Sequence, residues 1–187
     1  EWTDSESKKT FQTLNPENNE PWAEVPEASE KDVDKAVKAA QKAFEGTWSK
    51  LFPKERAKYL KAIAEQLREN AEHLGKIETI DTGKLFKETK TQANYIAEYY
   101  DYYAGLADKV EGTVLPIDKA NMQVITTRVP IGVVAAIIPW NSQMLLTAVK
   151  LAPALAMGNT VVIKSSELAP ATLFEFAKLI EKVGIPK

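Results

Sequence analysis

The fold is decided by one stretch, Ile131-Gly132-Val133-Val134-Ala135-Ala136-Ile137-Ile138. Its apolar residues follow one another without polar alternation, which predicts a strand buried on both faces, as in parallel sheets covered by helices. A helical segment from about Gln143 to Met157 follows and is stopped by Gly158-Asn159. A second apolar strand, Thr160–Lys164, and an amphipathic helix, Ala171–Val183, complete a βαβα unit, whose crossover should be right-handed.

Upstream of this unit the pattern is helical. Ser29 and Asp32 resemble a capping box and precede apolar residues at helical spacing. Pro53 suits the first turn of a second helix, which we expect to end at Gly75. A third helix is expected from about Phe86 to Lys109, and the periodicity of its tyrosines favours packing.

The remaining segments are extended. The first 28 residues, rich in Asn, Pro and Glu, predict an arm or strand lying on the rest. Two β-favouring runs, 111–117 and 121–129, are joined by Asp118-Lys119-Ala120 and predict a hairpin. We therefore expect an arm over 1–28, a helical part over 29–110, a hairpin over 111–129 and a βαβα unit over 130–187. Two parallel strands are few for a sheet, so the fold class is α/β with the truncated start of a doubly wound nucleotide-binding sheet.

Composition excludes several classes of function. The 187 residues carry a net charge of −2 with 44% hydrophobic residues, which indicates a globular protein without a nucleic-acid footprint. The polar N-terminus is not a signal peptide, and the longest apolar run is too short to cross a bilayer, so we expect no membrane association and a cytoplasmic location. Without cysteine, and with His73 as the only histidine, a transition-metal site is not expected.

Ligands of open α/β sheets bind beyond the carboxyl ends of the strands, where Asn141, Lys164 and Glu167 stand. Lys164 and Glu167 could hold a ribose diol, or they could be surface charges near a helix N-terminus. Asn141 could donate to a developing oxyanion, or it could be a turn or helix-cap residue after Trp140. Trp140 could be a cofactor-facing wall or core. No G-x-G-x-x-G fingerprint occurs, so a dinucleotide would have to be held differently.

Several motifs, in order, resemble the aldehyde dehydrogenase superfamily over about residues 14–187. They are Asp81-Thr82-Gly83-Lys84, Val129-Pro-Ile-Gly-Val-Val-Ala-Ala-Ile-Ile-Pro-Trp-Asn141, Lys150-Leu-Ala-Pro-Ala-Leu-Ala-Met-Gly-Asn-Thr-Val-Val-Ile-Lys164 and Gly184-Ile-Pro-Lys187.

The resemblance implies an NAD cofactor, with NADP possible, a small aldehyde as substrate and a homo-oligomer, dimer or tetramer, built with the hairpin at 111–129. It implies that Lys164 and Glu167 hold the adenosine ribose, Glu167 favouring NAD, and that Asn141 serves the oxyanion hole. The other implied positions are Ile137, Ile138, Pro139, Trp140 and Ser166 for the cofactor, and Ser142 and Leu146 for the substrate.

In that family a cysteine attacks the aldehyde, and a glutamate-activated water hydrolyses the resulting thioester; both residues would lie beyond Lys187. The sequence departs from the family at Ser142-Gln143, where Phe-Pro is common, and at Lys164-Ser-Ser-Glu167, where Lys-Pro-Ser-Glu is common. Ser142 predicts a smaller, more polar substrate wall. We therefore expect the N-terminal fragment of an aldehyde dehydrogenase. The alternatives are a stand-alone nucleotide-binding or assembly module without catalysis, and a branch that uses acyl-CoA or semialdehydes.

Overall fold

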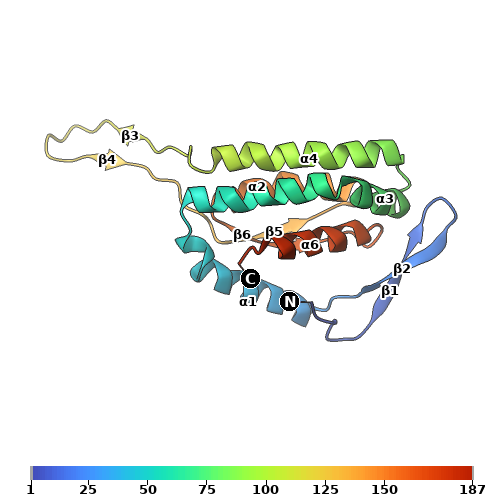
Figure 1. The fold of residues 1–187 in the computed structure, drawn as a ribbon. Helices are drawn as coiled ribbons and strands as arrows, with labels where there is room; N and C mark the ends of the chain where they lie inside the picture. Colours follow the sequence, from blue (N-terminus) through green and yellow to red (C-terminus); the bar gives the residue numbers. More distant parts are fainter. Residues whose placement is uncertain (1, 187) are drawn as a thin grey trace.

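The computed structural model describes residues 2–186, so Lys187 of the closing motif lies outside the described residues. Figure 1 shows α4, α2, the β5–β6 sheet with α6, and α1 in successive layers from top to bottom, with one hairpin projecting at each side. The first elements are β1 (Thr10–Asn15), β2 (Glu20–Pro26), α1 (Glu30–Glu45), η1 (Trp48–Lys50), α2 (Pro53–Glu69), α3 (Ala71–Thr82) and α4 (Phe86–Leu106). The later ones are β3 (Val114–Leu115), β4 (Val124–Ile125), β5 (Val133–Ile137), η2 (Trp140–Ser142), α5 (Gln143–Ala156), β6 (Thr160–Lys164) and α6 (Ala171–Val183).

Helix α1 begins at the predicted place. The Ser29 backbone N–H donates to Asp32 Oδ2 at 2.8 Å, and the capping box is complete. The apolar stripe of this helix is nevertheless not buried, since Val33 is 53% exposed and Val37 is 41% exposed. The helix lies against β6, and its Ala40 carbonyl accepts the Thr160 hydroxyl at 3.0 Å. Helix α1 thus covers the strand while most of its apolar face stays open.

The prediction of one helix from Pro53 to Gly75 is wrong. Helix α2 ends at Glu69, and Asn70, with φ −109° and ψ 13°, separates it from α3. The Asn70 backbone N–H makes the last helical bond of α2, to the Gln66 carbonyl at 3.1 Å, and its side-chain amide caps the same carbonyl at 2.8 Å. Gly75 lies inside α3, where a Cβ would stand 2.9 Å from the Lys90 backbone, so glycine permits close packing of α3 on α4.

The core lies between α2, α4, α5 and the sheet. The predicted α2 stripe is buried, with Leu60 and Leu67 at 0% exposure. Tyr100 of α4 is fully buried against it. Tyr95 and Tyr102 are more than half exposed, so packing explains only part of the tyrosine-rich stretch.

The parallel pairing of β5 with β6 confirms the predicted βαβα order, in the register Val133↔Thr160 to Ile137↔Lys164. The prediction that this first strand is buried on both faces is wrong for β5. Ala136 is 1% exposed, whereas Ile137 is 71% exposed, because within residues 2–186 the sheet has only these two strands and one strand face lacks a full helical cover.

Asn159 fixes the start of the sheet. Its side-chain oxygen accepts the backbone N–H groups of Ile131 and Gly132 at 2.8 and 3.2 Å, and its amide donates to the Ala154 carbonyl at 3.3 Å. Arg56 of α2 donates to the Ala156 carbonyl at 3.1 Å and so holds the end of α5. These contacts determine where the two strands, and therefore their carboxyl ends, stand relative to the helices.

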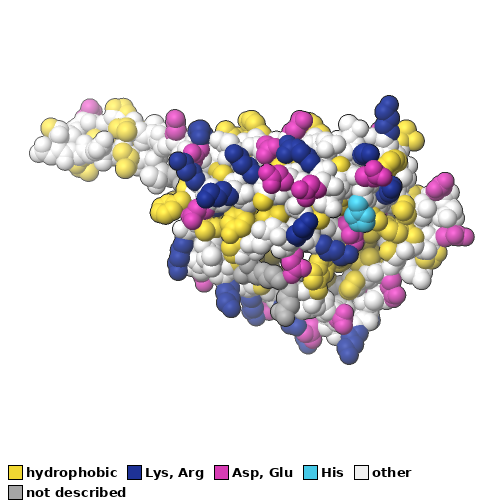
Figure 2. Space-filling view, viewed as in Figure 1, with side chains coloured by type: hydrophobic (Ala, Val, Ile, Leu, Met, Phe, Trp, Pro, Cys, Tyr) yellow, Lys and Arg dark blue, Asp and Glu magenta, His cyan; other side chains and the backbone are white. Residues whose placement is uncertain are grey.

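Two hairpins leave the body. The predicted N-terminal arm contains the antiparallel pair β1–β2, whose inner residues Thr13 and Val25 are buried. The predicted hairpin at 111–129 pairs over only two residues a strand, Val114↔Ile125 and Leu115↔Val124. It projects at the left of Figures 1 and 2. Its exposed apolar side chains are Val114, Leu115, Ile117, Met122, Ile125 and Val129. None of the helices within residues 2–186 is long and apolar enough to cross a membrane.

Candidate functional site

The carboxyl ends of β5 and β6 stand level at one edge of the sheet. Ile137 pairs with Lys164, and the Ile138 backbone N–H donates to the Lys164 carbonyl at 3.0 Å. Ile137 and Trp140 are 71% and 51% exposed, and Pro139 is exposed as well. Ile138 differs from its neighbours, because at 2% exposure its side chain belongs to the core. The strand ends therefore offer an exposed apolar surface in which Ile138 takes part only through its backbone.

A charged pair stands at the end of β6. Lys164 Nζ lies 2.9 Å from Glu167 Oε2, and both side chains are about two-thirds exposed. The bond from Lys164 holds the pKa of the Glu167 carboxyl below its usual value, so that carboxyl is ionised at neutral pH. Ser166 is buried, and its hydroxyl accepts the Leu168 backbone N–H at 3.2 Å, which shapes the loop that carries Glu167.

Asn141 lies in the 3₁₀ turn η2 at the end of β5 and is exposed. Helix α5 begins after Ser142, which is its N-cap, and no side chain caps this end. Of the two structural alternatives, a turn residue or a helix cap, Asn141 is thus a turn residue, and it does not cap α5. Within residues 2–186 the Asn141 side chain makes no hydrogen bond, so its amide is available as a donor.

Gln143 joins the two strand-end segments. Its side chain is fully buried at the start of α5, and its amide nitrogen donates to the Ala169 carbonyl in the segment before α6. Sequence reasoning noted Gln143 only as a departure from a family pattern. Its position holds the Asn141 turn and the Glu167 loop in a fixed relation.

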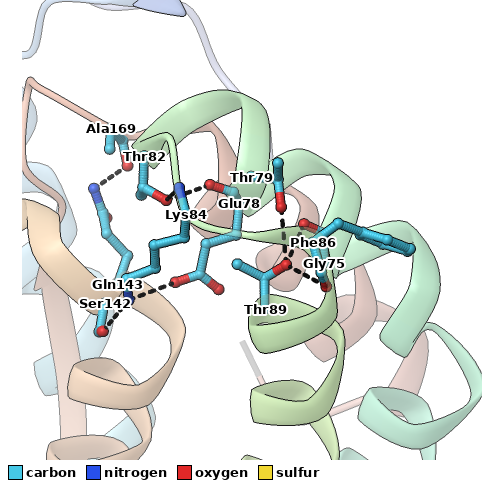
Figure 3. Close-up of polar contacts among 10 residues, drawn as sticks. All are labelled: Gly75, Glu78, Thr79, Thr82, Lys84, Phe86, Thr89, Ser142, Gln143 and Ala169. Carbon is cyan, nitrogen blue, oxygen red and sulfur yellow. Dashed lines mark hydrogen bonds and ion pairs between the residues drawn. The ribbon is translucent and has the colours of Figure 1, made fainter. Parts of the chain in front are cut away.

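A third group of polar side chains lies at the corner between α3 and α4, where α3 contacts η2 (Figure 3). Lys84 Nζ stands between two partners: it donates to the Ser142 hydroxyl, and it lies 4.0 Å from Glu78 Oε1. Glu78 is wholly buried, and burial raises the pKa of its carboxyl to about 7. Neither of its carboxylate oxygens accepts a hydrogen bond from any residue between 2 and 186. We call Glu78, Lys84 and Ser142 the corner cluster.

Hydrogen bonds of one side chain, Thr89 of α4, tie α3 and α4 together at the corner. The Thr89 hydroxyl contacts the Gly75 carbonyl at 2.8 Å, the Phe86 carbonyl at 3.0 Å and the Thr79 hydroxyl at 2.9 Å (Figure 3). Gly83 ends α3 with φ +74°, a conformation that favours glycine. Lys84 directly follows Gly83, and its side chain extends from the corner to Ser142 at the start of α5. Leu146, one turn into α5, is half-buried.

Asp81 holds α6 in place. Its Oδ2 accepts the Ala171 and Thr172 backbone N–H groups at 2.8 and 3.3 Å, and its Oδ1 accepts the Thr13 hydroxyl at 3.2 Å. Burial, the largest effect, raises the pKa of this carboxyl. Asp81 thus joins the N-terminal hairpin, α3 and the helix behind the Glu167 loop.

Sequence reasoning missed the role of Glu78 although a signal existed. Leu67, Ala71 and Leu74 continue at helical spacing to Glu78, so a carboxylate occupies a position on an apolar stripe. Buried carboxylates are rare unless paired, and that makes such a position a functional candidate. His73, the only histidine of the sequence, is exposed, and its Nε2 lies 3.0 Å from Glu175 Oε2.

The sequence matches the aldehyde dehydrogenase family over residues 2–187. A (Z)-2-((N-methylformamido)methylene)-5-hydroxybutyrolactone dehydrogenase of Acinetobacter baylyi is 53% identical over 94% of this chain and 36% of its own length. Betaine aldehyde dehydrogenase of Bacillus subtilis is 43% identical over the whole chain and 38% of its own length. The structure of betaine aldehyde dehydrogenase from Staphylococcus aureus in complex with NAD⁺ superposes with a TM-score of 0.96 at 39% identity, covering 100% of this chain and 37% of that one. The chain therefore spans little more than a third of these relatives.

Proposed function

This chain belongs to the aldehyde dehydrogenase family, and we propose that it supplies part of the active site of an enzyme that oxidises an aldehyde to the carboxylic acid with NAD⁺. The observation that carries the proposal is the level pairing of the two strand ends, which brings Asn141 and the Lys164–Glu167 pair to one edge of the sheet. In this proposal the 187 residues contribute a ribose site and an oxyanion donor to a longer protein. The family match supports the α/β fold with the start of a nucleotide-binding sheet.

The residues at this edge fit a dinucleotide. The ionised Glu167 carboxylate can accept from a ribose hydroxyl, Lys164 can donate to the same diol, and Ser166 shapes their loop. The exposed Ile137, with Pro139 and Trp140, offers apolar contact to the rest of the cofactor, which accepts a hydride from the substrate carbon when bound. Glu167 would repel a 2′-phosphate, so we propose NAD rather than NADP as the preferred cofactor.

Asn141 is proposed as the oxyanion donor. Its free amide stands on a turn that the contacts of Gln143 and Ser142 hold, so the position of the donor residue is fixed before the substrate arrives. The chain contains no cysteine, so a cysteine nucleophile would come from outside these 187 residues, and we propose the same for the glutamate that activates water. Ser142 and Leu146 are the proposed substrate-facing residues.

The projecting β3–β4 hairpin is proposed to join subunits. Its short ladder leaves backbone groups and apolar side chains such as Val114 and Ile125 exposed, a surface suited to pairing with another sheet. The resulting assembly would be a homo-oligomer. Size-exclusion chromatography with light scattering on the full-length protein tests this, and a monomer at micromolar concentration would contradict it.

The proposed reaction is tested by NADH formation. The full-length protein that contains these 187 residues, supplied with NAD⁺ and a short aliphatic aldehyde, should reduce NAD⁺ and release one equivalent of carboxylic acid. Absence of NADH with a panel of aldehydes, or absence of a cysteine from the roughly one hundred residues that follow, would overturn the proposal. If intact-mass measurement shows a natural protein of only 187 residues that still binds NAD⁺ in a titration, the protein is a nucleotide-binding module and not an enzyme.

A further inference from the structure

The corner cluster bears on substrate choice because of where Ser142 stands. It directly follows Asn141 in the η2 turn, and consecutive Cα atoms lie about 3.8 Å apart. In the proposed function Ser142 faces the substrate, so a substrate whose carbonyl oxygen meets the Asn141 amide has its neighbouring atoms beside Ser142. Ser142 is half-buried, and its contact with Lys84 is its only side-chain hydrogen bond within residues 2–186. The side chain is therefore partly open to a ligand and is held from one direction only.

The direction of that contact is fixed by chemistry. A lysine ammonium has three N–H donors and no acceptor, so the Ser142 oxygen must accept from Lys84. The Ser142 hydroxyl proton cannot point at Lys84, and it is left to be donated elsewhere. With Lys84 in place, Ser142 is thus a hydrogen-bond donor towards its open side.

Glu78 keeps Lys84 in this position. Lys84 is only 28% exposed, and Glu78, at 0%, is the carboxylate that faces its ammonium group at 4.0 Å. An ionised carboxylate that is buried without hydrogen bonds is costly unless a cation stands near, so Glu78, when ionised, and Lys84 hold each other at the corner. Partial neutralisation by Glu78 also weakens the attraction of Lys84 for anions in general.

We propose that Lys84, positioned by Glu78, orients the Ser142 hydroxyl as a donor, so that the site prefers aldehydes carrying a neutral acceptor oxygen close to the carbonyl carbon. Ser142 is then the residue that determines specificity, and Lys84 and Glu78 are positioning residues that act through it. The inference rests on the proposed function, because it needs a substrate at Asn141. A purely structural ion pair would instead affect all aldehydes alike.

The test compares two aldehydes of equal heavy-atom count, methoxyacetaldehyde, which carries an ether oxygen, and butanal, which carries a methylene in its place. In the full-length enzyme kcat/KM should favour methoxyacetaldehyde by roughly threefold to tenfold over butanal, the effect of one neutral hydrogen bond. The preference should lie mainly in KM, because this bond is present in bound substrate and transition state alike.

Three variants separate specificity from folding. Ser142→Ala and Lys84→Met should remove the preference for methoxyacetaldehyde over butanal in kcat/KM. Lys84→Arg, which keeps a cationic donor, should retain that preference. Lys87→Met, an exposed lysine on α4, is the matched control and should leave both substrates unchanged. Should Lys84→Met fail to fold, the Ser142→Ala and Lys84→Arg pair still decides the question.

A ratio that stays the same in Ser142→Ala, or a wild-type enzyme without preference between the two aldehydes, would overturn the inference. So would a loss in Lys84→Met that is equal for both substrates. These results differ from failure of the proposed function itself, which would show as no NADH from either aldehyde.

Discussion

The strand-end edge and the α3–α4 corner both adjoin the η2 turn, and they differ in how many of their polar groups have partners within the chain. At the strand ends Ile137, Trp140 and Glu167 are exposed, and the Asn141 amide has no partner within residues 2–186. At the corner, Glu78 and Thr89 are wholly buried, and the contacts of Thr89 are all made within the chain. Substitutions at the edge should therefore change ligand binding and turnover with little effect on stability, whereas substitutions at the corner should change stability as well.

The largest effect is expected at the edge. Asn141→Ala in the full-length protein removes the proposed donor to developing negative charge and should lower kcat by roughly 10²- to 10³-fold. Its melting temperature should stay near that of wild type, because the Asn141 side chain is exposed. Steady-state kinetics and thermal unfolding check the two halves together, with Asn18→Ala in the β1–β2 turn as the control. Unchanged turnover in Asn141→Ala would remove it from the oxyanion site.

The second effect belongs to the corner and depends on pH. Burial raises the pKa of Glu78 to about 7, with Lys84 opposing the shift and Asp81 adding to it. Between pH 4.5 and 7 the folded chain keeps a proton that the unfolded chain has released. The free energy of unfolding therefore falls as pH rises through this window, by roughly 3 kcal/mol in all, and changes no further above it.

Glu78→Gln tests this sign, because the amide cannot titrate. Urea unfolding of the 187-residue chain at several pH values should show the fall in wild type and its absence in the variant. Glu88→Gln, an exposed glutamate on α4, should behave like wild type. A difference between wild type and Glu78→Gln that is constant from pH 4.5 to 7 would mean that Glu78 has an ordinary pKa.

The two regions also differ in how far the sequence predicted them. The position of Asn141 and Glu167 at the strand ends could be predicted because apolar runs identify the strands locally, and ligands bind at such ends in open α/β sheets. The corner cluster could not, because Lys84 and Ser142 are 58 residues apart and meet only through packing of α3 against η2 and of α4 on α5.

The errors have similar physical causes. The break at Asn70 depends on a side-chain amide that takes the Gln66 carbonyl, and helix periodicity runs smoothly across it. The exposure of Ile137 depends on how many strands the sheet contains, which the apolar run itself does not report. Local pattern thus predicted the order of elements, and long-range contacts determined what each face meets.

A smaller effect is expected at Asp81 of α3. This residue holds α6 and the β1–β2 hairpin and makes no hydrogen bond to Asn141, Lys164 or Glu167 at the strand-end edge. Asp81→Ala leaves two α6 backbone N–H groups and the Thr13 hydroxyl without their acceptor. The free energy of unfolding should fall by roughly 1–3 kcal/mol. Urea unfolding measures it against Asp118→Ala, an exposed residue in the projecting hairpin. If Asp81→Ala is as stable as that control, its hydrogen bonds do not hold α6.

The smallest effect is expected from Glu167→Gln at the edge. Glu167 is exposed, and its charge is partly neutralised by Lys164 at 2.9 Å, so its repulsion of a 2′-phosphate is screened by solvent and by that partner. The ratio of kcat/KM for NAD⁺ to that for NADP⁺ should therefore fall only several-fold in the full-length enzyme, with the loss for NAD⁺ and the gain for NADP⁺ both contributing. Glu98→Gln on α4 serves as the charge-matched control. Because an electrostatic repulsion weakens with added salt while a lost ribose hydrogen bond does not, the NADP⁺ gain should shrink at high ionic strength and the NAD⁺ loss should persist. A cofactor ratio identical to that of wild type at low salt would show that neither interaction involves Glu167.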